Sequence, residues 1–190
     1  MSAHDDNSAG LPGVERLALG ATLKLGMALM GTRRHLKLFA REANHLLEMA
    51  DTFDHDYASR RARIPRMQGI EADSCHWSLF MVFDHLVQVD GLILQIVRDL
   101  HQGLEPLVTV SIADLKPDPD AGAESVAAFE TTARQFQATV LERLPLRAEA
   151  RFPHPWFGPL NARGWVALAA THHRTHRRQA RKIITTLGVV

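Results

Sequence analysis

Cysteine is almost absent from this chain, whose 190 residues include only Cys75. A single cysteine cannot form an intrachain disulfide, and it cannot build a cysteine-rich zinc site. A chain without disulfides suits the reducing cytosol, so we expect a cytoplasmic protein. Any metal site in this protein would have to use nitrogen and oxygen ligands.

The sequence also lacks a large excess of charge of one sign. Its 22 lysine and arginine residues nearly balance its 21 aspartate and glutamate residues, which gives a formal net charge of +1. A nearly neutral chain has no general attraction for nucleic acid. Binding partners must therefore be inferred from local features.

Long apolar runs are missing as well. The fairly apolar stretch 11–31 is interrupted by Glu15, Arg16 and Lys24, so it does not have the pattern of a membrane span. The first ten residues are acidic where a secretory signal needs positive charge. We therefore expect neither membrane insertion nor export. Residues 1–31 are predicted to be an N-terminal extension, a partly disordered leader followed by an amphipathic segment whose glycines weaken it as a helix.

Residues 32–190 are predicted to form one all-α domain. Helical periodicity marks four segments, at about residues 32–52, 73–101, 123–143 and 162–187. Asp73 or Ser74 is expected to cap the second helix, and Asn161 the fourth. The connections 104–122 and 146–160 contain several prolines and are long enough for consecutive helices to run parallel. These features predict a four-helix bundle with long crossover connections, and only residues 107–112 are compatible with an extended conformation.

Three histidines occupy apolar helix faces. His172 and His176 are four residues apart, so a helix points both imidazoles to the same side, and that side is otherwise mostly apolar. His85 lies in the middle of the apolar face of the second helix. For any one of them, a core histidine that donates to a backbone carbonyl is the simpler interpretation. The three together favour a metal site in which a fourth position stays open for water or substrate.

A divalent cation on three neutral imidazoles would keep its full positive charge to act on whatever fills the open position. A bound thiol would become a thiolate for transfer to an electrophilic carbon, whereas a bound water could hydrolyse. Zinc and nickel both suit imidazole ligands. A third alternative is a metal-binding protein without catalytic turnover.

Aromatic residues precede and begin the last helix. Trp156, Phe157 and Trp165 are candidates for the mouth of a small-molecule pocket, together with Met81 on the face that carries His85. An equally good interpretation is that these aromatic residues plug the end of the bundle. If these residues do line a pocket, we expect the binding partner to be a small-molecule substrate.

Other polar residues of the two helices are expected to face solvent. Asp84 and His173 each point about 100° away from their histidine neighbours on a helix, so both are predicted to lie outside the site. The last helix also carries a basic face that consists of Arg174, Arg177, Arg178, Arg181 and Lys182. This face could bind phosphate or nucleic acid, but it contains no aromatic platform, and cations near a helix C-terminus also offset the helix dipole. We therefore consider nucleic-acid binding the less favoured function.

The order and spacing of these residues resemble the DinB superfamily of metal-dependent bundle proteins. The resemblance is carried by His85 in Phe-Asp-His-Leu, the connection His-Pro-Trp-Phe-Gly-Pro-Leu from His154, and Trp165 followed by His172-x-x-x-His176 with Gln179. It covers most of the chain from residue 32 to residue 187. It implies an up-down-down-up bundle in which His85, His172 and His176 hold the metal.

Characterised relatives in that superfamily include transferases and isomerases that use a low-molecular-weight thiol. The resemblance therefore implies a metal-activated thiol as cofactor and a small-molecule substrate. It also implies a homodimer, which the apolar stretch before residue 32 supports. Residues 1–31 have no clear counterpart in the family pattern.

Overall fold

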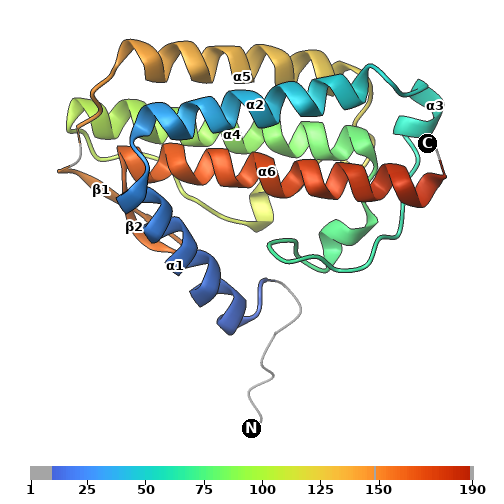
Figure 1. Cartoon of the computed structure of the whole chain (residues 1–190), viewed down its shortest axis with the longest axis horizontal. Helices are drawn as coiled ribbons and strands as arrows, with labels where there is room; N and C mark the ends of the chain where they lie inside the picture. Colours follow the sequence, from blue (N-terminus) through green and yellow to red (C-terminus); the bar gives the residue numbers. More distant parts are fainter. Residues whose placement is uncertain (1–9, 148, 189–190) are drawn as a thin grey trace, which may run out of the picture.

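The computed structural model describes residues 10–147 and 149–188 and contains the expected four-helix bundle (Figure 1). Its helices are α2 (Thr32–Ala50), α4 (Leu79–Gln102), α5 (Glu124–Glu142) and α6 (Ala162–Leu187). In the view of Figure 1, α2 and α6 run from left to right, whereas α4 and α5 run from right to left. The topology is therefore up-down-down-up. Helix α6 packs against both α2 and α4, and α5 packs against the same two helices from the other side.

Helix α6 has the predicted bounds because both of its ends are capped. The Asn161 side chain accepts a hydrogen bond from the Gly164 backbone N–H at 3.0 Å, and Gly188 ends the helix with φ +73°. Such a left-handed conformation favours glycine. Helix α4 likewise ends at Gly103, with φ +79°.

The predicted start of α4 is wrong by several residues. Asp73–His76 form a separate short 3-10 helix, and Ser78 caps α4 by accepting from the Met81 backbone N–H at 3.2 Å. The carbonyls of Cys75 and Trp77 accept hydrogen bonds from the backbone of Ile64 and Ala62. This pairing holds Trp77 in an extended conformation, so the chain cannot become helical before Ser78.

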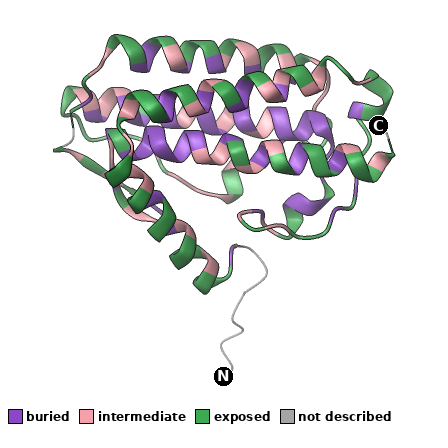
Figure 2. Cartoon of the chain, viewed as in Figure 1, coloured by how far each residue is buried: buried purple, intermediate pink, exposed green. Residues whose placement is uncertain are grey.

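Helix α4 is the most apolar helix of the bundle. Buried residues occur along most of the length of this helix, as the purple segments in Figure 2 show. Among the described helices, it alone is long and apolar enough to cross a membrane, with a mean hydropathy of 1.5. Its position between α5 and α6 accounts for this composition, since 61% of the most apolar 18-residue stretch of the helix is buried inside the protein.

A small hairpin between α5 and α6 was not predicted. Strands β1 (Arg151–His154) and β2 (Gly158–Asn161) pair antiparallel, with Phe152 opposite Leu160. Proline is depleted in strands, and three prolines in this stretch conceal its extended character in the sequence. The stretch 107–112, which we considered compatible with an extended conformation, forms no strand.

The N-terminal extension forms a complete helix, α1 (Gly13–Leu29), which packs across α6. Glycine allows this close contact, since a Cβ atom on Gly164 would lie only 3.0 Å from the Met27 methyl carbon. The Glu15 carboxylate fastens α1 to the connection between α2 and α4 by accepting from the Gly69 backbone N–H and from Arg66. The leader predicted before α1 lies mostly outside the described residues.

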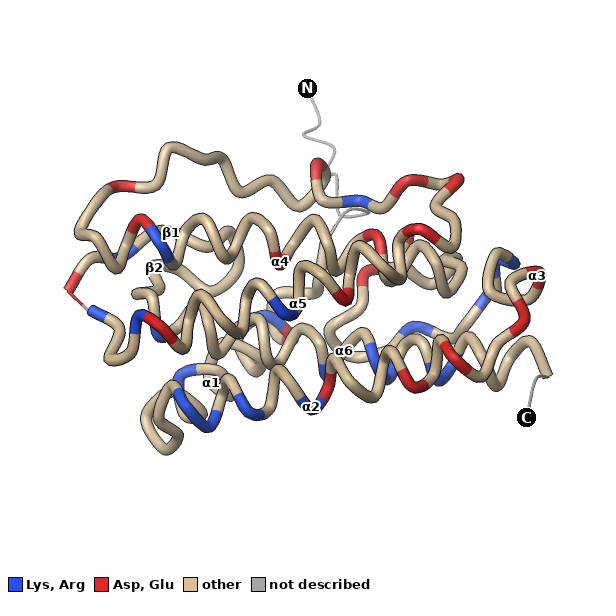
Figure 3. Tube along the Cα trace, turned by 90° about the horizontal axis from the view of Figure 1, so that it is seen from above, with Lys and Arg blue, Asp and Glu red and all other residues tan. Residues whose placement is uncertain are grey.

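A buried ion pair joins α2 to α6. Glu42 is only 1% exposed, and its carboxylate pairs with Arg177 of α6 and with Arg41. Burial alone would raise the pKa of Glu42, but the hydrogen bonds and charges of the two arginines outweigh burial and lower it. Arg177, one of the five residues of the basic face, therefore pairs with a buried carboxylate and is not free to bind a partner. Figure 3 shows acidic as well as basic positions where α2 and α6 run side by side.

A candidate metal centre between two helices

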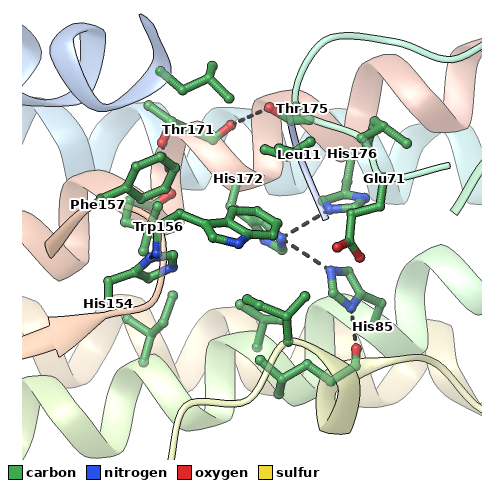
Figure 4. Close-up of a pocket in the computed structure, with 18 of the residues that line it drawn as sticks. Leu11, Glu71, His85, His154, Trp156, Phe157, Thr171, His172, Thr175 and His176 are labelled. Carbon is green, nitrogen blue, oxygen red and sulfur yellow. Dashed lines mark hydrogen bonds between the residues drawn. The ribbon is translucent and has the colours of Figure 1, made fainter. Parts of the chain in front are cut away.

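His85, His172 and His176 meet at one point between α4 and α6 (Figure 4). The Nε2 atom of His172 lies 3.2 Å from Nε2 of His85 and 3.0 Å from Nε2 of His176. Nitrogen ligands at the usual zinc distance of about 2.0–2.1 Å in a tetrahedral arrangement lie about 3.3 Å apart. The two separations from His172 are close to this value, and all three ligand atoms lie within 4.8 Å of one another.

The proton of His85 is fixed by a backbone carbonyl. Its Nδ1 atom lies 2.6 Å from the carbonyl oxygen of Leu115, in the long connection between α4 and α5. Only a protonated Nδ1 can donate to a carbonyl, so the neutral ring presents an unprotonated Nε2 to the cluster. This is the tautomer that a metal ligand at Nε2 requires.

The proton of His176 is fixed through Gln179. The Gln179 amide nitrogen donates to the carbonyl of Ser74 at 2.6 Å, which turns its oxygen toward Nδ1 of His176 at 2.7 Å. His176 must therefore donate from Nδ1 and present an unprotonated Nε2 as well. Both outer histidines thus direct lone pairs at His172.

His172 cannot satisfy both neighbours by itself. Its Nε2 carries at most one hydrogen, which can be donated to His85 or to His176 but not fully to both. Its Nδ1 atom is buried and has no hydrogen-bond partner among the described residues. A cation at the common point would accept all three lone pairs. The donor set therefore fits a metal ion better than it fits a closed hydrogen-bond network.

The three imidazoles are held in the neutral form. Burial lowers the pKa of His85 to about 4, and it lowers the pKa values of His172 and His176 well below the ordinary value. The neighbouring imidazoles lower the pKa of His172 further, because each opposes a second positive charge nearby. Neutral imidazole is the form that binds metal ions.

A cavity of about 180 Å³ opens beside the three histidines. Trp156, Phe157 and Trp165 line it, as expected. Met81, which we also expected there, does not line the cavity. It is buried at the start of α4, where its sulfur lies 3.5 Å from the Ser78 backbone nitrogen and completes the helix cap.

Several other residues of this site were not predicted. Trp77 stacks on His176 with ring centroids 6.0 Å apart, and Glu71 lines the cavity with its carboxylate 2.8 Å from the Lys116 ammonium. His154 also lines the cavity and stacks on Phe157 at 4.7 Å. Glu71, Trp77 and Lys116 lie in irregular connections, where helical periodicity gives no information about direction.

The prediction that His173 faces solvent is wrong. His173 is fully buried, and its Nε2 lies 2.7 Å from the Asp90 carboxylate, which is also fully buried. Its ring packs on Phe39 with centroids 4.1 Å apart. A rotation of about 100° from His172 leads into the core rather than to solvent, because α6 is covered by α4 on one side and by α2 on the other.

Asp84 is no part of the histidine cluster, as expected, but it is not a free surface charge. Its carboxylate accepts hydrogen bonds from the Asp118 backbone N–H at 2.8 Å and from the Gln88 side chain at 2.7 Å. It thereby anchors the connection that carries Leu115 and Lys116. Asp84 thus supports the site indirectly.

Comparison with known proteins supports the fold. No family model matches the chain, and no curated protein matches its sequence. The crystal structure of TT2238, described as a four-helix bundle protein, is similar to this chain with a TM-score of 0.55 and 25% sequence identity. The similarity covers 78% of this chain and 96% of TT2238. The four-helix bundle is therefore shared with a solved structure.

The lowered histidine pKa values predict that the metal-free protein loses stability as the pH falls from about 6.5 to about 4. The unfolded chain binds protons in this range while the folded chain does not, so acidification favours unfolding. His85 alone should contribute on the order of 2–3 kcal/mol. Urea unfolding of the metal-free protein at several pH values measures this slope. His85→Ala should flatten it and the exposed control His76→Ala should not, whereas equal slopes in both variants would contradict the prediction.

Proposed function

We propose that this protein is a divalent-metal-dependent enzyme of the DinB superfamily and that it acts in the cytoplasm. The observation that carries the proposal is the convergence of three Nε2 atoms, two of them fixed as unprotonated by Leu115 and Gln179. The up-down-down-up bundle and the sequence resemblance support the family assignment. Zinc and nickel are the favoured ions, because both suit imidazole ligands.

Loss of a ligand histidine should abolish most metal binding. We expect His85→Ala, His172→Ala and His176→Ala each to weaken zinc or nickel binding by about 100-fold or more, because loss of a ligand exceeds the 10–100-fold cost of losing an outer hydrogen bond. Elemental analysis and competition with a chromophoric chelator measure this.

His76 provides the matched control, since it is exposed and lies in the short 3-10 helix just before α4. His173→Ala is unsuitable as a control, because it would leave the carboxylate of Asp90 buried without its partner. Equal metal content in the three ligand variants and in His76→Ala would refute the site.

We propose that Glu71 is the proton acceptor of the reaction. A bound cation would lower the pKa of a thiol or water at its open position. The Glu71 carboxylate points toward the space between His85 and His176 in Figure 4, and its side chain is only 12% exposed. Lys116 holds the carboxylate in place at 2.8 Å, and the carbonyl of the preceding Leu115 binds His85. The same connection thus positions both the ligand and the base.

We favour thiol transfer over hydrolysis because the cavity walls are mostly apolar and exclude water from the nucleophile. In this reaction the thiol proton goes to Glu71, and the thiolate sulfur forms a bond to an electrophilic carbon of a small substrate. The bond from that carbon to its leaving group breaks, and the leaving group departs with the electron pair and takes the proton from Glu71. Metal-assisted hydrolysis is the second candidate, since the same three ligands could activate water. A metal-binding protein without turnover would show neither activity.

Glu71→Gln should keep the metal and lose activity. The amide has the same shape but cannot accept a proton, and general-base catalysis contributes about 10²–10⁴-fold to a rate. We therefore expect metal content like that of the wild type and a loss of turnover of this size, in assays of thiol transfer to electrophilic acceptors. Glu105→Gln, at an exposed position between α4 and α5, is the matched control. Full activity in Glu71→Gln would remove Glu71 from the mechanism.

Nucleic-acid binding is not supported by the basic face of α6. Arg177 is paired with the buried Glu42, and Figure 3 shows acidic as well as basic positions where α2 and α6 run side by side. Such mixed charge gives little attraction for a phosphate backbone.

We also propose that the protein is a homodimer that associates through α1. The outer face of this helix exposes Val14, Leu17, Leu25 and Leu29 to between 59% and 82%. Alanines at 18, 21 and 28 lie between these aliphatic side chains, and such alternation of small and large residues lets two copies of one helix pack closely. A symmetric dimer would bury the same face of both copies.

Sedimentation equilibrium tests the dimer. We expect the wild-type protein to sediment as a dimer and Leu17→Glu to sediment as a monomer, because a charge cannot be buried at this contact without a partner. Leu141→Glu, on the exposed face of α5, controls for the change of charge. A wild-type protein that stays monomeric at high micromolar concentration would refute the dimer.

A further inference from the structure

The walls of the cavity beside the three histidines are apolar over most of their area. Val89, Leu92 and Ile93 of α4 form one side, and Trp156, Phe157 and Leu168 form another. An apolar wall stabilises a ligand that gives up contact with water, and it penalises a charged or strongly polar one. The chemistry of the walls therefore restricts what the cavity can hold.

The threonine hydroxyls on the walls are already satisfied, whereas the Trp165 indole nitrogen and Nδ1 of His172 have no partner among the described residues. The hydroxyls of Thr22, Thr171 and Thr175 each donate to a carbonyl four residues earlier in their own helix. They therefore offer methyl groups and no free donor to a ligand. The charged residues that line the cavity among the described residues are Glu71 and Lys116, and these neutralise each other. The described walls therefore carry no unpaired charge that would stabilise a charged ligand.

Helix α1 and Leu11, two residues before it, form one wall of the cavity. Leu11 and Leu23 are 4% and 5% exposed, and both line the cavity together with Leu19. The contacts of Glu15 with Gly69 and Arg66 fasten this wall to the loop that leads to Glu71. The family resemblance begins only after α1, so this wall belongs to the extension and not to the shared bundle.

The volume of the cavity sets the size of the ligand. At about 180 Å³ it is slightly larger than a 150 Å³ apolar cavity that is known to accept benzene. One aromatic ring, or an aliphatic group of similar size, fills such a space. The end of the cavity at the three histidines is its polar end.

We propose that this cavity selects a ligand with an uncharged apolar body the size of one aromatic ring and a thiol or similar donor at the histidine cluster, and that α1 supplies the selecting wall. The part of the proposal that concerns the donor rests on the proposed metal site. The part that concerns the apolar body rests on the cavity alone. The two parts can be tested separately.

The apolar body is tested on the metal-free protein with fluorobenzene, whose binding fluorine NMR reports. We expect saturable binding to the wild-type protein and about 10-fold weaker binding to Leu19→Trp, since the indole would fill part of the cavity. Leu141→Trp is the matched control on the exposed face of α5, outside the cavity, and it should bind like the wild type. If circular dichroism shows that Leu19→Trp does not fold, Leu19→Ala takes its place and should bind several-fold more weakly because it removes part of the wall.

The donor is tested on the cobalt-loaded protein, in which a coordinated thiolate gives a charge-transfer absorption band. We expect benzyl mercaptan to bind about 10–100-fold more tightly than mercaptoethanol, because burial of its ring adds apolar contact with the same donor. Leu141→Trp should keep this preference and Leu19→Trp should reduce it.

The outcomes separate the two proposals. Absence of fluorobenzene binding, or equal effects of Leu141→Trp and Leu19→Trp, overturns the inference about the cavity and α1 whatever the metal does. Fluorobenzene binding without cobalt binding supports the inference about the apolar body and refutes the metal site. Cobalt binding with equal affinity for both thiols keeps the metal site and overturns the selection of an apolar body.

Discussion

Three neutral imidazoles whose nitrogen lone pairs meet inside an apolar interior are the constraint on which the rest of the structure depends. Such rings would normally be kept apart or joined by protons, yet here two outer hydrogen bonds place the protons on the far side of His85 and His176. The lone pairs of these two rings face His172, whose Nε2 can donate fully to only one of them. A cation at their common point resolves the arrangement, because it accepts every lone pair at once.

The long connections of the bundle serve this arrangement. The connection after α4 supplies the Leu115 carbonyl, and the connection before α4 supplies the Ser74 carbonyl that orients Gln179. Asp84 fastens the first of these connections to α4. A histidine ligand is usually held by a partner that fixes its tautomer and its direction. In this protein those partners come from irregular segments, so the bundle carries the ligands and the loops determine their protonation.

Helical periodicity was sufficient for the bundle and for the direction of the three histidines. Each lies on a long, strongly apolar stripe, and such stripes face the core in almost any packing of the helices. Periodicity failed for His173, because it predicts one buried face, whereas α6 is buried against α2 as well as α4. It also failed for Met81, whose side chain packs at its own helix cap instead of reaching the cavity.

Residues outside the helices could not be predicted, for a different physical reason. The Trp77 carbonyl accepts a hydrogen bond from the Ala62 backbone, and the Glu71 carboxylate pairs with Lys116. No local sequence pattern encodes these contacts between segments that are distant in sequence. The hairpin before α6 could not be predicted because it contains prolines, which are uncommon in strands. The role of α1 also required the structure, since its sequence shows an apolar helix on which the cavity-lining face and the exposed face look alike.

X-ray absorption spectroscopy of the zinc-loaded protein is the most direct test of this account. The account predicts a first shell of nitrogen or oxygen atoms only, at about 2.0–2.1 Å, with the multiple-scattering signature of three imidazoles. A first shell with a sulfur atom at about 2.3 Å in the absence of added thiol, or with fewer than three imidazoles, would contradict it.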